Sequence, residues 1–270
     1  IEIFNGKHPK QFLRQLVSSQ LDMDRLDYLK RDSFFSGVTE GNIGTERIIN
    51  MLDVVNDNLV VEEKGIYSIE KFLIARRLMY WQVYLHKTVV SAENMLIKVL
   101  QRAKDLITAG KKVYAPPSLF VFLNNNYTLN DFDTNPQLLN DFAELDDFDI
   151  YASLKYWKNN PDFVLSSLSD MILNRKLLKI KVQNTAFNTS EIENEVDSIQ
   201  QQFNISKQEA EYFVFSDKIS NSTYNNEKAN INILMKNGDV IDIAVASDYF
   251  NIEALNKIVN KYFLCYPKLK

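Results

Sequence analysis

Cysteine, histidine, glycine and proline are all scarce in this sequence, and each scarcity excludes a class of protein. Cys265 is the single cysteine among 270 residues, so neither an internal disulfide nor a cysteine metal cage can form. Seven glycines and six prolines are too few for a collagen or a Pro/Gly-rich disordered chain. The two histidines, His8 and His86, cannot by themselves supply a histidine-rich metal site, which usually takes three or more protein ligands.

Long hydrophobic runs and an excess of one charge are also missing. No segment approaches the roughly 18 uninterrupted apolar residues of a membrane-spanning helix, and the N-terminal residues lack the pattern of a signal peptide. We therefore expect a soluble, cytoplasmic protein without membrane contacts. Thirty-one basic and 35 acidic residues give a net charge of −4, so strong binding to nucleic acid is not expected.

The hydrophobic spacing predicts a mainly helical first part. Apolar residues recur at intervals near 3.6 over residues 9–32, 45–55, 150–157 and 164–172. The strongest pattern runs from Ser68, a candidate cap, to Gly110, a candidate terminator, and indicates one long helix or two abutting helices. Between residues 113 and 154 seven acidic residues occur without Lys or Arg, which indicates a surface or linker segment.

The pattern changes near residue 175. Residues 179–182 alternate as in a strand, 190–203 read as a helix, 212–215 as a strand, and 252–263 as a last helix. Residues 231–246 predict a hairpin whose Asn237-Gly238 pair suits a type I′ turn. We therefore predict a mainly α region over residues 1–174, followed by a small α+β lobe with a β-hairpin over residues 175–270.

The segment DMDRLDYLKRD, residues 22–32, is the most informative for function. Asp24, Tyr28 and Asp32 are spaced four apart, so on a helix they share one face. Arg25 would be placed to bind a phosphate whose metal ion Asp24 holds. The alternative is a solvated helix face with a weak surface pair, and periodicity alone favours this alternative because charged helix faces are common.

The amino-acid sequence of this segment resembles the final-aspartate helix of HD-domain phosphohydrolases, in particular that of the deoxynucleoside triphosphate triphosphohydrolases. In those enzymes the helix has the approximate sequence D-x-D-K-x-D-Y-x-x-R-D. The resemblance implies Asp24 as the last metal ligand and Arg25 as a phosphate contact. It implies Tyr28 and Asp32 as contacts to the sugar. Arg25 replaces the Lys of the family, which retains the charge but changes its shape.

A second segment, ARRLMYWQVYLHK at residues 75–87, is similar to another helix of the same family. By that resemblance Arg76 would bind phosphate and Tyr84 would contact the sugar, whereas Leu85 stands where the vertebrate member of the family has Gln. Taken alone, these residues would be read as an ordinary helix surface with a core aromatic. The family also places basic residues at a nucleotide effector site between subunits, and the matching positions here are Arg47, Lys64, Lys87, Arg175 and Lys179.

The His and His-Asp motifs that complete the metal site of this family are missing, since no His-Asp pair occurs in these residues. Together with a start at Ile1, this indicates the C-terminal portion of a longer enzyme, and we expect these 270 residues alone to be inactive. The resemblance implies that the intact enzyme would use a divalent metal ion (Mn, Mg, Fe, Zn or Ni) to hydrolyse a dNTP to deoxynucleoside and triphosphate. A homo-oligomer that binds a nucleotide or another phosphorylated small molecule is expected. The alternatives are an HD phosphatase acting on another phosphoester and a non-catalytic nucleotide-binding or assembly module.

Overall fold

The chain forms two compact units in a computed structural model that describes residues 1–221, 224, 230–248 and 258–268. The first unit contains residues 1–86 and 219–260, and the second contains residues 87–218 and 261–270. The boundary predicted near residue 175 falls inside the second unit. The two units are defined by contacts between segments that lie far apart in the sequence. A change in residue pattern along the chain, on which the predicted boundary was based, gives no information about such contacts.

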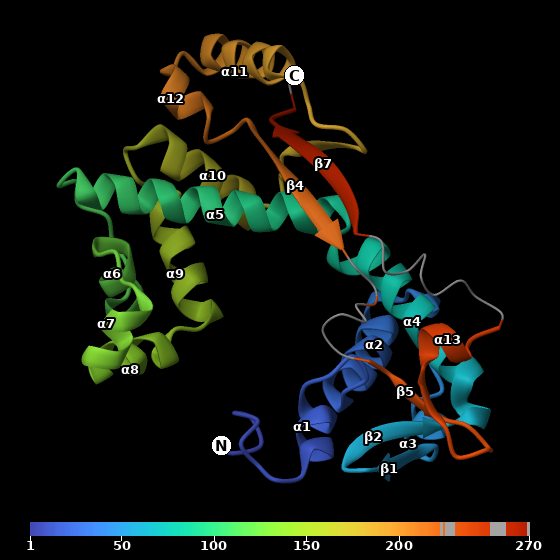
Figure 1. The fold of residues 1–270 in the computed structure, drawn as a ribbon. Coiled ribbons are helices and arrows are strands. Elements are labelled where there is room, and N and C mark those ends of the chain that lie inside the picture. The colour runs from blue at the N-terminus through green and yellow to red at the C-terminus, as the bar shows by residue number, and fades with distance from the viewer. Residues whose placement is uncertain (222–223, 225–229, 249–257, 269–270) are drawn as a thin grey trace. The chain divides into compact units, whose positions relative to one another are not determined.

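The first unit combines helices with a four-stranded sheet (Figure 1). Its helical elements are α1 (Gln11–Val17), α2 (Met23–Ser36), η1 (Thr39–Gly41), α3 (Thr45–Ile49), η2 (Glu63–Gly65), α4 (Ile66–Met79), the π-helical turn η3 (Tyr80–Tyr84) and α13 (Ile243–Ala246). The strands are β1 (Leu52–Val55), β2 (Asn58–Glu62), β5 (Asn232–Leu234) and β6 (Val240–Asp242), in the order β1-β2-β5-β6. The β1–β2 and β5–β6 pairs are antiparallel, and β2 pairs with β5 in parallel.

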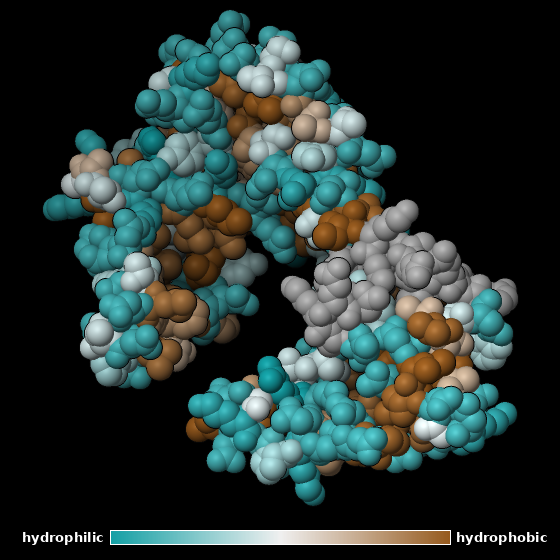
Figure 2. All heavy atoms as spheres, in the orientation of Figure 1, coloured by the Kyte–Doolittle hydropathy of each residue, from teal (hydrophilic) through white to brown (hydrophobic). Residues whose placement is uncertain are grey.

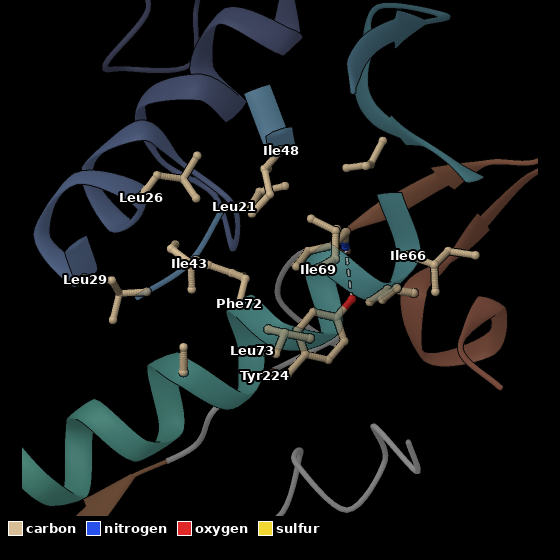
Figure 3. Close-up of a cluster of buried hydrophobic side chains, with 14 of the residues drawn as sticks. Leu21, Leu26, Leu29, Ile43, Ile48, Ile66, Ile69, Phe72, Leu73 and Tyr224 are labelled. Carbon is tan, nitrogen blue, oxygen red and sulfur yellow. Dashed lines mark hydrogen bonds between the residues drawn. The ribbon is translucent and has the colours of Figure 1, made fainter. Parts of the chain in front are cut away.

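The core of the first unit lies between α2, α4 and the sheet. Leu29, Ile69, Phe72 and Leu73 are fully buried in it (Figure 3). Tyr224 joins this cluster, and its hydroxyl accepts a hydrogen bond of 3.0 Å from the backbone N–H of Ile231. This packing fixes α2 against α4; α2 carries the first motif identified in the sequence, and the second motif begins on α4 and continues into η3.

The second unit is mainly helical and has a three-stranded sheet. Its helices are α5 (Lys87–Thr108), α6 (Pro117–Asn124), α7 (Leu129–Thr134), α8 (Pro136–Glu144), α9 (Asp147–Trp157), α10 (Phe163–Leu173), α11 (Thr189–Phe203) and α12 (Lys207–Ala210). Its strands, β3 (Lys179–Gln183), β4 (Phe215–Asn221) and β7 (Val259–Tyr266), follow the order β3-β7-β4, and β3 and β7 are antiparallel. The ends of β4 and β7 extend across the division between the units.

The fold class is as predicted, mainly helical with small sheets, and no helix within the described ranges is long and apolar enough to cross a lipid bilayer. Hydrophobic side chains reach the visible surface only in separate patches between hydrophilic ones (Figure 2). The pattern from residue 68 to 109 resolves into two helices, α4 and α5, with the π-helical turn η3 between them in the sequence. Gly110 ends α5 in the left-handed conformation (φ 74°), as predicted, but α4 begins at Ile66 and Ser68 is not its cap.

Several local predictions are wrong. The region 45–55 is helical only to Ile49 and then enters β1, and the strand predicted at 212–215 begins at Phe215. Residues 259–263 of the helix predicted over 252–263 belong to β7, whereas its residues 252–257 lie outside the described residues. Of the two readings given for the acidic segment, surface is correct and linker is wrong: the acidic residues are exposed or partly exposed, and the segment forms α6–α8 and most of α9, with Asp131, Asp146 and Asp149 in capping boxes at helix starts.

The type I′ turn lies in the other hairpin. Asn56 and Asp57 connect β1 to β2 with φ values of 48° and 62°, and positive φ at both central residues defines this turn type. In the β5–β6 hairpin only Gly238 has a positive φ (89°), and its N–H donates to the carbonyl of Met235. This is the pattern of a three-residue loop that ends in a glycine bulge.

Candidate functional site

Helix α2 begins at a hydrogen-bonded corner over residues 18–22. Asp22 is the N-cap, and its carboxylate accepts hydrogen bonds from the backbone N–H groups of Arg25 (2.8 Å) and Ser19 (3.2 Å). The hydroxyl of Ser19 accepts a bond of 3.1 Å from the N–H of Leu21. An N-cap of this kind contributes about 1 kcal/mol. The corner separates α1 from α2 and so replaces the single helix predicted over residues 9–32.

The guanidinium of Arg25 also contacts this N-cap. Its Nη1 forms an ion pair with the carboxylate of Asp22, which is 2% exposed. The Nε of Arg25 is buried and has no hydrogen-bond partner within the described parts of the chain. The charge of Arg25 is therefore largely balanced by Asp22, while one donor remains unused.

Arg76 lies on α4 and is 8% exposed, which is unusual for a permanently charged side chain. Its Nη1 donates a hydrogen bond of 3.1 Å to Oε1 of Gln20, a neutral amide, and its Nε is buried without a partner among the described residues. Among the described residues, no carboxylate lies at ion-pair distance from Arg76. A buried cation without a counter-ion is costly, so this position is suited to an anionic ligand.

Three tyrosines form an aromatic cluster, and one of them, Tyr28, lies near these two arginines. The ring of Tyr84 contacts those of Tyr28 and Tyr80 edge to face, with centroid distances of 5.8 and 5.2 Å. The hydroxyl of Tyr84 donates a hydrogen bond of 2.6 Å to Asp32 on α2. The π-helical turn that follows α4 carries Tyr80 and Tyr84, so this local irregularity directs both rings toward α2.

The pKa values of two phenols are raised in this cluster. Burial is the main cause for Tyr28, and the neighbouring Tyr80 adds to it, so that the pKa of Tyr28 is about 12. The positive charges of Arg76 and Arg25 act in the opposite direction, which shows that both guanidinium groups lie within electrostatic reach of this phenol. Burial, followed by the hydrogen bond to Asp32, also raises the pKa of Tyr84. Both tyrosines are therefore neutral hydrogen-bond donors near pH 7.

The structure brings together five of the residues that the sequence singled out, namely Arg25, Tyr28, Asp32, Arg76 and Tyr84. Asp24 lies on the first turn of α2 and is exposed. Within the described residues it belongs to no group of three side chains that could hold a metal ion. One carboxylate binds a divalent ion weakly, so these residues do not make a metal site by themselves.

The sequence reasoning missed Gln20, Asp22 and Tyr80. A signal for Asp22 was present, because an Asp before a helical pattern with an acidic first turn is a typical N-cap. No local signal pointed to Gln20 or Tyr80, since their partners Arg76 and Tyr28 lie more than 50 residues away in the sequence.

The five candidate effector residues divide between the units. Arg47 and Lys64 belong to the first unit, where the guanidinium of Arg47 donates to the hydroxyl of Ser68 (3.3 Å) and to the carbonyl of Lys64 (3.4 Å). The ammonium of Lys64 pairs with Glu62 at 2.5 Å. The other three belong to the second unit: Lys87, Arg175 and Lys179.

A separate cavity of about 700 Å³ lies at the C-terminal end of α2. Lys30, Arg31, Phe34, Phe35 and Asn42 contribute to its lining. Neither of the two arginines discussed above lines this cavity, so its size does not identify it as the anion site.

The chain is similar to several known proteins. The family model described as "HD associated region" matches residues 43–114. The crystal structure of a phosphohydrolase from Bacteroides thetaiotaomicron is 52% identical, superposes with a TM-score of 0.93, and is matched over 99% of this chain and 66% of its own.

Two curated relatives extend the comparison. An uncharacterized protein of Bacillus subtilis, YwfO, is 30% identical over 99% of this chain and 60% of its own length. A Dictyostelium discoideum protein named as a deoxynucleoside triphosphate triphosphohydrolase SAMHD1 homolog is 27% identical over 42% of this chain and 23% of its own length. The chain thus spans less than two thirds of each of these relatives. The chain is therefore similar to HD-domain phosphohydrolases, and residues 43–114 match their HD associated region.

Proposed function

We propose that this chain forms the phosphate- and sugar-binding part of an HD-type phosphohydrolase that hydrolyses a dNTP to deoxynucleoside and triphosphate. The observation that carries the proposal is the buried guanidinium of Arg76, which has a neutral partner and an unused Nε donor. A triphosphate would supply the missing negative charge and accept hydrogen bonds from this group. The name of the Dictyostelium relative supports the nucleotide class.

Each residue of the cluster has a proposed role. Arg76 binds the triphosphate, and Arg25 adds a second, partly balanced charge beside it. Tyr28 presents a neutral hydroxyl group to the sugar, and the Tyr84 oxygen, whose proton is donated to Asp32, can accept a hydrogen bond from a sugar hydroxyl. Asp32 holds the hydroxyl of Tyr84 and thereby orients its ring.

The described residues of this chain would supply only part of the site for a divalent metal ion. Asp24 offers one carboxylate, and the remaining ligands would have to come from outside the described residues. We therefore expect the 270-residue chain alone to bind nucleotides without hydrolysing them.

Calorimetric titration with a dNTP tests the binding role. The wild-type chain should bind, and Arg76→Ala should reduce the affinity about tenfold or more, as expected for the loss of a charge-assisted hydrogen bond. Arg77→Ala is the matched control, because Arg77 is the next residue of α4 and its charge is not among those that act on the Tyr28 phenol. Equal affinities of wild type and Arg76→Ala would reject the proposal.

Product analysis tests the reaction class in a protein that contains this chain together with the complete metal site. Incubation with manganese and a dNTP should release inorganic triphosphate. Release of orthophosphate would instead indicate a phosphatase acting on another phosphoester.

Binding of a regulatory nucleotide is the remaining part of the proposal. Arg47 supports it, because its guanidinium donates to a hydroxyl and a carbonyl and forms no ion pair within the described ranges. Size-exclusion chromatography with and without dNTP should then show a nucleotide-dependent homo-oligomer. An elution volume that does not respond to nucleotide would argue against this regulation.

A further inference from the structure

The two arginines of the cluster are held by chemically different partners. Arg25 is paired with the carboxylate of Asp22, whereas Arg76 donates to the side-chain amide of Gln20. The amide oxygen accepts the hydrogen bond without carrying a charge. Gln20 therefore orients Arg76 and leaves its full positive charge available.

Gln20 is well placed for this task because the corner before α2 constrains it. Its neighbour Leu21 is buried in the core of the first unit, and the N–H of Ser19 is bound to Asp22. Gln20 itself lies outside any helix, between α1 and α2, so its side chain reaches across to α4. Asp22 thus holds Arg25 directly and helps to fix the backbone that carries Gln20.

A glutamate at position 20 would have nearly the same size and would form an ion pair with Arg76. Such a pair would satisfy the buried guanidinium in the absence of ligand and neutralise its field. An incoming anion would then have to compete with the carboxylate. The amide is thus the partner that orients this arginine and still favours anion binding.

We propose that Gln20 is a positioning residue that holds Arg76 for a polyphosphate ligand and keeps its charge free. This inference rests on the proposed function, because it assumes that Arg76 binds the phosphate groups. Gln20 would thus help to set the affinity for polyphosphate, because its side chain is a neutral amide and not a carboxylate.

The test uses inorganic tripolyphosphate as the probe and the 270-residue chain, with affinity measured by calorimetry and stability by thermal unfolding. Gln20→Glu should bind tripolyphosphate about tenfold or more weakly, while its melting temperature should equal or exceed that of the wild type. Gln20→Ala should weaken binding less and lower the melting temperature. Gln11→Glu adds the same charge on α1 at an exposed position, and its affinity should match that of the wild type.

If Gln20 is a positioning residue, Gln20→Glu weakens binding without lowering the melting temperature. If Gln20 has only a structural role, the substitution lowers both the affinity and the melting temperature. If Gln20→Glu binds tripolyphosphate as the wild type does while Arg76→Ala does not bind it, the role proposed for Gln20 is rejected and the proposed function is retained. If the wild-type chain fails to bind tripolyphosphate, or if Arg76→Ala binds equally well, both proposals are overturned.

Discussion

The hydroxyl of Tyr84 donates a hydrogen bond of 2.6 Å to the carboxylate of Asp32, a residue 52 positions earlier in the chain. This bond ties the π-helical turn after α4 to the second half of α2. It also links the two sequence motifs that carry the resemblance to HD-domain phosphohydrolases. Removing one partner should therefore affect both stability and ligand binding.

Replacing Tyr84 with Phe tests this link. We expect Tyr84→Phe to lower the free energy of unfolding by about 1 kcal/mol, because a hydrogen bond to a charged acceptor is lost while the ring packing against Tyr28 stays. Urea denaturation followed by fluorescence measures the change. Tyr67→Phe, an exposed position on α4, should change little. A similar loss in both variants would show that the bond to Asp32 contributes nothing specific.

The raised pKa of Tyr28 predicts a loss of stability at alkaline pH. Its folded pKa of about 12 lies above the ordinary value of 10.0, so the folded state favours the neutral phenol. The resulting stabilisation is present below pH 10 and is lost as the pH rises through the folded value. In Tyr28→Phe this loss should be smaller, and an ultraviolet titration of the folded protein should lack the component near pH 12. Identical alkaline titrations of the two proteins would contradict the burial of this phenol.

Gly41 should tolerate no side chain, because it lies where η1 packs between α2 and α4. A Cβ atom at this position would lie 2.9 Å from the carbonyl oxygen of Leu29 and 2.8 Å from the sulfur of Met79. We expect Gly41→Ala to destabilise the protein by about 1–3 kcal/mol through overpacking. Gly44→Ala is the control, since its nearest contact would be Arg47 Cβ at 3.7 Å. Thermal unfolding should separate the two variants, and equal melting temperatures would refute the close approach.

The ion pair between Arg102 and Asp162 should make the second unit sensitive to acid. Nε and Nη2 of Arg102 contact the two carboxylate oxygens at 3.0 and 2.5 Å. Burial raises the pKa of Asp162, but the hydrogen bonds from Arg102 and from the N–H of Leu165 outweigh it and lower the pKa below 3.8. The stabilisation is therefore present above the ordinary carboxyl value and is lost as the pH falls through the lowered one.

Asp162→Asn keeps an N-cap acceptor for α10 but removes the charge. At neutral pH we expect it to lower the free energy of unfolding by about 2 kcal/mol, with the difference from wild type shrinking in acid. Denaturant titrations at several pH values measure both effects. The control is Asp27→Asn, which breaks an exposed pair with Arg31 and should have little effect. A difference from wild type that does not depend on pH would contradict the role of the charge.

The local features of the fold could be read from the sequence. The spacing of apolar residues predicted α5, α10 and α11, and Gly110 was identified as the end of α5. The four-residue spacing placed Asp24, Tyr28 and Asp32 on one helix, and α2 contains all three. These outcomes depend on interactions between residues a few positions apart, which the sequence displays directly.

Tertiary contacts decided the remainder. Residues 259–263 have helical spacing, yet β7 is a strand because it pairs with β3 and β4 on its two sides. The corner at residues 18–22 interrupts a continuous helical pattern, since the bonds to the Asp22 carboxylate satisfy the backbone there. The sequence by itself determined which residues share a face of α2. Only the packing of α2 against α4 decided that Gln20 meets Arg76 and Asp32 meets Tyr84, because no local pattern encodes contacts across more than 50 residues.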